Sequence, residues 1–134
     1  MKKCQKCIIC PYIKECKQIK GKNFSWKINT KITCESHNLI YMIECQKERC
    51  QERYIGETER SLKYRISEHI GYINTKNKSK ATGHHFNLPG HSLSDLKVTA
   101  IEKVKKFNTE YRKERESYLI RKFNTFYQGI NWMP

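Results

Sequence analysis

Apolar residues recur along this chain in patterns that predict three strands. The apolar stretch at 39–45 contains β-branched and aromatic residues. A shorter stretch follows at 53–56 after a polar link, so the two together predict a β-hairpin. Residues 96–104 alternate between apolar and polar side chains well enough to form a third strand.

Two helices are predicted from the spacing of apolar residues. The first can be capped by Thr58 or Ser61 and runs to about Ile73. Its buried stripe consists of residues three or four positions apart, namely Leu62, Ile66, Ile70 and Ile73. The second helix begins after Asn108 and ends near Phe123. The predicted fold is therefore α+β, with a small three-stranded antiparallel sheet flanked by helices.

The remaining segments are polar and lack a sustained period. Residues 74–80 predict a basic loop and residues 83–91 a His-rich turn. Residues 1–37 are rich in lysine and hold five of the seven cysteines, so a metal is expected to order them. The sequence therefore predicts a Cys-rich zinc-binding extension over 1–37 and a folded domain over 38–134.

The charge of the chain points to a polyanionic partner. Lys and Arg number 27 against 13 Asp and Glu, which gives a net charge of +14 spread along the chain. Such a surplus favours nucleic acid ahead of an anionic membrane and predicts salt-sensitive binding. Lys76, Lys78 and Lys80 alternate in the basic loop, a pattern suited to following a phosphate backbone, although any one of them also fits a solvated loop.

The sequence shows neither a membrane-spanning run nor a signal peptide, and this suggests the cellular compartment. No run approaches 18 apolar residues, and the start, Met1 to Cys4, is not followed by the apolar core of a signal peptide. We therefore expect an intracellular protein. An odd count of seven cysteines without an export signal favours metal ligands over disulfides, so a secreted disulfide-linked basic protein is disfavoured.

A few residues distant in sequence have the side chains that phosphodiester hydrolysis requires. The reaction needs an activated water, a cation near the phosphoryl oxygens and help for the departing alkoxide. Glu116 can hold Mg²⁺ (or Mn²⁺), Arg65 can clamp a phosphoryl oxygen, and Tyr41 or His69 can orient or deprotonate water. Arg65 and His69 are four positions apart and so project from one side of the first helix. The basic surroundings are expected to lower the pKa of the tyrosine.

Taken singly, each of these residues also has an ordinary explanation. Tyr41 and Tyr54 lie in strand-like segments, where tyrosine commonly packs half-buried. Arg65 and Glu116 lie on charge-rich helices, where a solvated face is usual. The catalytic prediction therefore depends on the set and its order.

The order of these residues resembles that of the GIY-YIG nuclease family. Leu39-Ile40-Tyr41 is similar to the family's first motif and Tyr54-Ile55-Gly56 to its second, and Arg65 follows Tyr54 by eleven residues. Glu116, followed by Leu119-Ile120-Arg121, resembles the family's late-helix glutamate. Asn131 is similar to the asparagine that closes the family core. The resemblance spans residues 38–131 and implies a catalytic set of Tyr41, Tyr54, Arg65, His69, Glu116 and Asn131.

Longer motifs resemble the C-terminal endonuclease domain of Penelope-like retroelements. They are Tyr54-Ile55-Gly56-Glu57-Thr58, Arg65 with Glu68-His69, and the segment 85–91, which reads His-Phe-Asn-Leu-Pro-Gly-His. This resemblance implies a domain that nicks DNA in the nucleus so that an attached reverse transcriptase can prime from the exposed 3′ end. Leu39 stands where the family has its first glycine. Since no polymerase is present, we expect either a fragment or a free-standing copy.

Two groups of residues have the spacing of zinc ligands. Cys45, Cys50, His85 and His91 form C-x4-C and H-x5-H pairs, with His84 competing with His85, and the Penelope-type nucleases resemble this pattern. Such a zinc would be structural, because four protein ligands leave no open position. Cys4, Cys7 and Cys10 form a second cluster, whose fourth ligand is Cys34 or Cys16. Free thiols in a flexible arm are the alternative explanation.

Two functions of different classes follow from these residues. The first is a Mg²⁺-dependent DNA endonuclease that nicks one strand. The second is a zinc-stabilised nucleic-acid-binding module in which the nuclease core is only a scaffold. Four intact side chains with hydrolytic chemistry favour the first, because an idle site has no physical need for all of them. The sequence predicts neither the target preference nor the oligomeric state.

Overall fold

The predicted three-stranded antiparallel sheet is confirmed in the computed structural model, which describes residues 1–132. Strand β3 (His37–Cys45) lies in the middle of the sheet, between β4 (Arg53–Ser61) and β5 (Leu96–Lys103), and is antiparallel to both. β3 and β4 form the predicted hairpin. β4 is longer than the apolar stretch at 53–56 that indicated it, because its second half is polar yet remains paired with β3.

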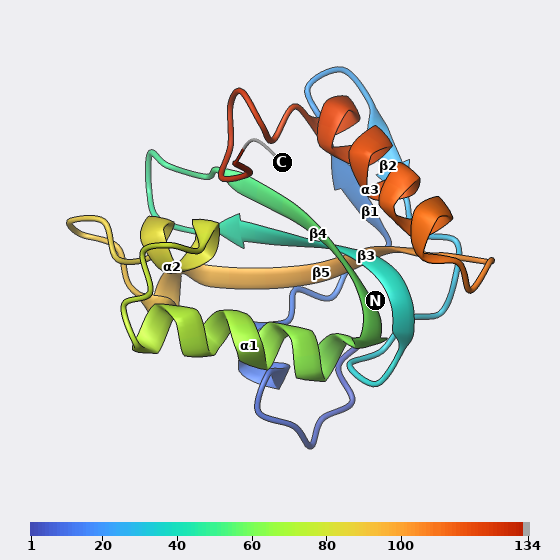
Figure 1. Cartoon of the computed structure of the whole chain (residues 1–134), viewed down its shortest axis with the longest axis horizontal. Coiled ribbons are helices and arrows are strands. Elements are labelled where there is room, and N and C mark those ends of the chain that lie inside the picture. Colours follow the sequence, from blue (N-terminus) through green and yellow to red (C-terminus); the bar gives the residue numbers. More distant parts are fainter. Residues whose placement is uncertain (133–134) are drawn as a thin grey trace.

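The two predicted helices lie on opposite faces of this sheet (Figure 1). Helix α1 (Leu62–Asn74) begins at Ser61, whose side chain accepts a hydrogen bond from the Tyr64 backbone N–H. Helix α3 (Thr109–Phe123) begins in the same way at Asn108. Both side chains satisfy a backbone donor that the first helical turn leaves free. The predicted caps and helix ends agree with the structure to within a residue or two.

Alternate residues of β3 supply the two halves of the core. Leu39, Tyr41 and Ile43 face the buried side of α1, whereas Ile40 and Met42 face α3. All five are completely buried, as expected for a central strand covered on both faces. The predicted stripe of α1 packs on the first of these faces, and its members are all buried: Leu62, Ile66, Ile70 and Ile73.

A short helix, α2 (Ala81–His85), occupies the start of the predicted His-rich turn. Its single turn follows the basic loop and packs against α1, where its Thr82 and His85 are buried. A five-residue helix has too few residues to show an apolar period, so the sequence indicated only a turn. A 3₁₀ turn, η2 (Leu93–Asp95), leads from there into β5.

The first 37 residues pack on the edge of the sheet at β5. Met1, Ile9 and Ile13 are buried in the α1 half of the core, and the Lys14 N–H donates to the Val98 carbonyl at 2.9 Å. A 3₁₀ turn, η1 (Cys10–Tyr12), precedes the small hairpin of β1 (Gln18–Lys20) and β2 (Ser25–Lys27). The sequence did not indicate these three-residue strands. The division of the chain into two units at residue 37 stays a prediction.

Within residues 1–132, no helix combines the length and apolar character required to cross a membrane.

Candidate active site

Two tyrosines from neighbouring strands lie side by side on the α1 face of the sheet. Tyr41 is on β3 and Tyr54 on β4, with ring centroids 6.3 Å apart. Gly56 pairs with Tyr41 across the two strands, and a Cβ atom at this position would overlap the hydroxyl end of the Tyr41 ring. The glycine therefore provides the space that the catalytic candidate Tyr41 occupies.

His69 connects Tyr41 to α2. Its Nε2 lies 2.7 Å from the Tyr41 hydroxyl, and its Nδ1 lies 2.6 Å from the Thr82 hydroxyl. Burial, with a smaller effect from the Arg65 charge, lowers the pKa of His69 to about 3. A neutral imidazole donates from one nitrogen and accepts at the other, so both ring nitrogens are engaged by protein groups. His69 therefore orients the Tyr41 hydroxyl and leaves no ring nitrogen free for water.

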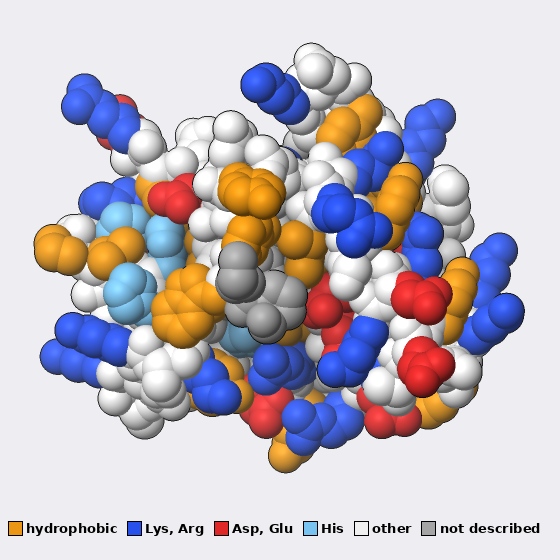
Figure 2. All heavy atoms as spheres, turned by 45° about the horizontal axis from the view of Figure 1, so that its top comes forward, with side chains coloured by type: hydrophobic (Ala, Val, Ile, Leu, Met, Phe, Trp, Pro, Cys, Tyr) orange, Lys and Arg blue, Asp and Glu red, His pale blue; other side chains and the backbone are white. Residues whose placement is uncertain are grey.

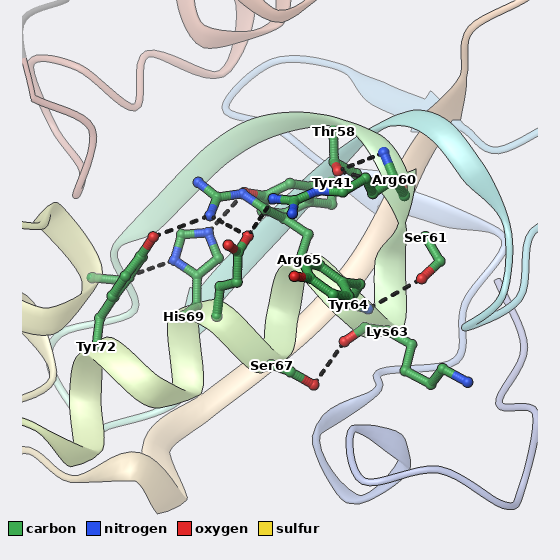
Figure 3. Close-up of polar contacts among 12 residues, drawn as sticks. Tyr41, Thr58, Arg60, Ser61, Lys63, Tyr64, Arg65, Ser67, His69 and Tyr72 are labelled. Carbon is green, nitrogen blue, oxygen red and sulfur yellow. Dashed lines mark hydrogen bonds and ion pairs between the residues drawn. The ribbon is translucent and has the colours of Figure 1, made fainter.

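Arg65 and His69 leave α1 on the same side, as predicted, and reach towards Tyr41 together with Tyr72 (Figure 3). Arg65 Nη1 donates to the Glu68 carboxylate at 3.1 Å and to the Tyr72 hydroxyl at 3.5 Å. These contacts hold the guanidinium beside the tyrosines. A permanent, planar cation here is suited to a phosphoryl oxygen.

Glu116 lies on α3, which packs against β4. Burial, followed by the charge of Glu57, raises the pKa of Glu116 to about 7. Its charge in turn contributes to the raised pKa values of Tyr41 and Tyr54. Glu116 therefore lies within electrostatic range of both phenols, and its own pKa also responds to the charge of Arg65.

The pKa of Tyr41 differs in direction from the prediction. Burial raises it well above the ordinary value, Tyr54 adds to this effect, and Arg65 opposes it without reversing it. The expectation that basic surroundings lower this pKa is wrong for the protein without metal. The physical reason is that a completely buried phenolate loses more hydration energy than one nearby cation returns.

Asn131 joins the C-terminal tail to β4. Its side-chain oxygen accepts from the Ile55 N–H at 2.7 Å, and its side-chain nitrogen donates to the Ile55 carbonyl at 2.9 Å. The Thr125 hydroxyl donates to the same oxygen at 2.6 Å. These contacts are all with the protein and fix the strand next to Tyr54.

Three participants in this arrangement were not predicted from the sequence. Thr82 contacts the His69 ring, but it belongs to no sequence motif that would have indicated this role. Glu57 follows the Tyr54-Ile55-Gly56 motif directly, and its carboxylate accepts from Arg112 Nε at 2.7 Å. Arg112 precedes Glu116 by one helical turn, and this spacing could have indicated that the two share a face.

The pattern of the GIY-YIG catalytic domain matches residues 37–131. The chain belongs to the GIY-YIG family. Its members are nucleases, so the chain carries an endonuclease domain that acts on the phosphodiester bonds of DNA and uses a divalent metal. A search of curated proteins and a search of solved structures each found no match.

The Cys/His cluster (Cys45, Cys50, His85 and His91) has the geometry of a metal site. One ligand atom from each residue lies within 4.8 Å of the others. His91 Nε2 is buried and has no hydrogen-bond partner among residues 1–132, while its Nδ1 lies 3.2 Å from the Pro89 carbonyl. A ring whose Nδ1–H donates to a carbonyl presents the Nε2 lone pair to a metal. His84 is exposed and packs on Trp132 instead.

The thiolate cluster (Cys4, Cys7, Cys10 and Cys34) is a second group that fits zinc. Cys10 Sγ lies 3.6, 3.4 and 3.8 Å from the sulfurs of Cys4, Cys7 and Cys34. Tetrahedral zinc with bonds of about 2.3 Å separates its sulfurs by about 3.8 Å. Cys34 is thus the fourth member, and Cys16 lies apart beside Thr99. All seven cysteines, which lie within the described residues, are free of disulfides.

The three lysines of the basic loop are exposed. Lys80 approaches the candidate site, because its ammonium lies 5.6 Å from the centre of the Tyr72 ring. The other two, Lys76 and Lys78, extend the positive charge away from it along the loop.

Proposed function

We propose that this chain is a Mg²⁺-dependent endonuclease that nicks one strand of DNA. The observation that supports this most directly is that Glu116, on α3, lies within electrostatic range of the two tyrosines and Arg65, which come from three other elements. Such a collection is costly to bury, since it desolvates a carboxylate and a guanidinium. A substrate phosphate and its metal would compensate for this cost.

Each side chain has a role that follows from its surroundings. Glu116 holds the divalent metal, which when bound neutralises charge on the phosphoryl oxygens and makes water more acidic. Arg65 binds a non-bridging oxygen of the phosphate. Tyr41 and Tyr54 orient the attacking water with their hydroxyls, and His69 fixes the hydroxyl of Tyr41. Because burial opposes a positive charge on His69, it acts as an orienting partner and does not store the proton.

The proposed reaction is hydrolysis at the bond between phosphorus and O3′. The water oxygen bonds to phosphorus as the P–O3′ bond breaks. One water proton ends on the departing O3′, which becomes a 3′-hydroxyl, and the other is released from the 5′-phosphate to solvent at neutral pH. The free 3′-hydroxyl is the group from which a polymerase can extend.

We assign the remaining predicted residues to support and to binding. Asn131 is proposed as a positioning residue, since its side-chain atoms bind Ile55 and Thr125. The Cys/His cluster is proposed as a structural zinc site that stiffens the β3–β4 hairpin, and the thiolate cluster as a second zinc site. Lys76, Lys78 and Lys80 are proposed to follow the phosphate backbone of the bound DNA.

The biological role that we propose is that of a retroelement nuclease. The motifs around Tyr54, Arg65 and His85 support a relation to Penelope-like elements, in which nicking provides a primer for reverse transcription. The partner would then be a reverse transcriptase that is normally part of the same polyprotein. We propose the nucleus as the place of action, because the target DNA is there.

Nicking of a supercoiled plasmid with Mg²⁺ tests the function directly. We expect Glu116→Ala to lose at least about a hundredfold in rate, comparable to the loss of an important electrostatic group in other enzymes. Tyr41→Phe removes only the hydroxyl and should lose rate to a similar order. Glu114→Ala changes an exposed carboxylate on the same helix and serves as the matched control, which should nick like the wild type.

The result that contradicts the proposal is a Glu116→Ala variant that nicks as fast as the wild type. The alternative, a binding module without cutting, has one observation in its favour, namely that Tyr41 is completely buried in the protein without DNA. It would be supported if a folded wild-type protein bound DNA but nicked nothing with Mg²⁺ or Mn²⁺.

A further inference from the structure

A groove beside Glu116 is lined by three aromatic side chains of the C-terminal tail. The groove has a volume of about 590 Å³ and is bordered by both Glu116 and Asn131. This volume lies within the ~300–1,000 Å³ of pockets that hold small organic ligands. We call Phe126, Tyr127 and Trp132 together the aromatic shelf.

Two of the three side chains of the aromatic shelf are unusually exposed, and Phe126 is half-buried. Tyr127 is 84% exposed and Trp132 48%, whereas large aromatic side chains are usually well covered. Figure 2 looks onto the side that carries the C-terminal tail and shows hydrophobic side chains gathered there, with Lys and Arg side chains around them. A contiguous exposed apolar surface is typical of an interaction site.

The backbone beneath the aromatic shelf is firmly attached to the sheet. The Ile130 N–H donates to the Arg53 carbonyl at 2.8 Å, and the Ile130 side chain is buried. A Cβ atom at Gly129 would collide with the Arg53 and Thr125 carbonyls, so the tail lies closely against β4. Asn131 adds its bonds to Ile55. The backbone of the tail at 129–131 is therefore held against β4, the strand that carries Tyr54.

The polar part of the groove suits a nucleotide. Arg121 is exposed and lines the groove together with Ser117 and Asn124, which supplies a cation and hydrogen-bonding groups next to flat apolar surface. Single-stranded nucleic acid is bound by this combination of a basic groove and aromatic side chains on which bases stack. Stacking requires a free base face, which a paired base inside a duplex does not offer.

We propose that the aromatic shelf binds an unpaired nucleobase adjoining the scissile phosphate. This inference rests on the proposed nuclease function and deepens it, because it defines the substrate as DNA that is locally unpaired next to the cut. The groove is bordered by Glu116, so a base stacked there would adjoin the phosphate whose metal Glu116 is proposed to hold. Stacking tolerates any base, and the preference is therefore for structure and not for sequence.

The test compares binding of two synthetic DNAs by the full chain carrying Glu116→Gln, which prevents cutting. One DNA is a fully paired duplex and the other has a short unpaired gap. We expect tighter binding of the gapped DNA, and we expect Tyr127→Ala and Trp132→Ala to weaken that binding roughly 5- to 150-fold each, the range measured for stacked bases. Paired duplex binding should change little. Tyr127→Phe keeps the ring and should bind as before.

Two further measurements separate stacking from a general loss of structure. Phe107→Ala removes another exposed aromatic residue, 64% exposed and outside the groove, and should keep the preference for gapped DNA. In a Trp26→Phe background Trp132 is the remaining tryptophan, and its fluorescence should be quenched by the gapped DNA alone. Equal affinity for the two DNAs, or unchanged binding by the alanine variants, would overturn the inference. If the wild type still nicked plasmid DNA in that case, only the inference about the aromatic shelf would fail and the proposed nuclease function would remain supported.

Discussion

At the scale of single residues, the ionisation of Glu116 depends on its neighbours. Its raised pKa has two causes, burial first and the charge of Glu57 second. Glu57 in turn is paired with Arg112, which is buried. Burial and the charge of Glu57 therefore raise the pKa of the group that we propose to hold the metal, and Arg112 holds the Glu57 carboxylate in place.

Glu57→Gln is expected to extend activity to lower pH. Glu116 must be ionised to bind a cation, so with its pKa at about 7 the proton competes with limiting Mg²⁺ below neutral pH. Loss of the Glu57 charge lowers this pKa and moves the acid limb of the pH profile down. At about pH 6 we expect the variant to retain about 3- to 10-fold more activity than the wild type, since one unit of pKa is a tenfold change in ionisation.

The pH profile of plasmid nicking at limiting Mg²⁺ measures this effect. Glu59→Gln is the matched control, because Glu59 is an exposed carboxylate on the same strand. If the pH profile of Glu57→Gln were unchanged, the loss of activity at low pH would not be caused by protonation of Glu116.

The sequence indicated which residues are catalytic candidates, but it did not indicate how their surroundings shift their pKa values. Tyr41, Tyr54 and Arg65 were proposed from their order and from the resemblance to the GIY-YIG family, and helical periodicity indicated that Arg65 and His69 share a side of the first helix. The balance between burial and charge at Tyr41 depends on contacts between distant elements. For that reason the direction of its pKa shift could not be predicted from the chain.

At the scale of elements, long periodic segments were predictable and short ones were not. β3, β5 and α1 each have an apolar pattern over eight or more residues, and α1 and α3 begin at recognisable caps. β1, β2 and α2 have five residues or fewer, and their positions depend on packing against the sheet and α1. Tertiary contacts dominate local preference in such short elements.

The zinc content of variants tests the ligands carried by the α2 region. The purified wild type is expected to hold about two zinc ions per chain, one in each cluster. His91→Ala removes a ligand of the Cys/His cluster and should reduce the content to about one, with a lower melting temperature because structural zinc contributes to folding. His84→Ala alters an exposed neighbour of His85 and should retain both ions.

Elemental analysis and thermal melting before and after a chelator provide the measurement. Loss of zinc in His84→Ala and retention in His91→Ala would show that the ligand assignment is reversed.

At the scale of the whole molecule, the surplus of positive charge determines how DNA is held. A net charge of +14 on 134 residues makes affinity fall steeply with salt, through release of counterions. The basic loop projects from the end of α1 beside Tyr72 and extends the candidate site in one direction. The aromatic shelf extends it in another, from Glu116 onto the tail.

Replacing Lys76, Lys78 and Lys80 together by Gln is expected to reduce the salt dependence of DNA binding. Each lysine that contacts a phosphate contributes roughly one unit to the slope of log affinity against log salt concentration, so the triple variant should lose about two to three units. Affinity should fall similarly for unrelated DNA sequences. Binding titrations at several salt concentrations measure the slope.

The control for this variant replaces three exposed lysines of the N-terminal segment, Lys6, Lys22 and Lys31. It has the same net charge. If both triple variants reduced the slope equally, the loop would contribute only general charge and no specific phosphate contacts.

Two residues in the single turn of α2 have different roles. Thr82 at its start holds the imidazole of His69, and His85 at its end belongs to the Cys/His cluster. If the Cys/His cluster holds zinc, as we propose, loss of that zinc would loosen the same helical turn that aligns the Tyr41 hydroxyl. The ability to cut would then decline with the zinc supply even though Glu116 remained unchanged.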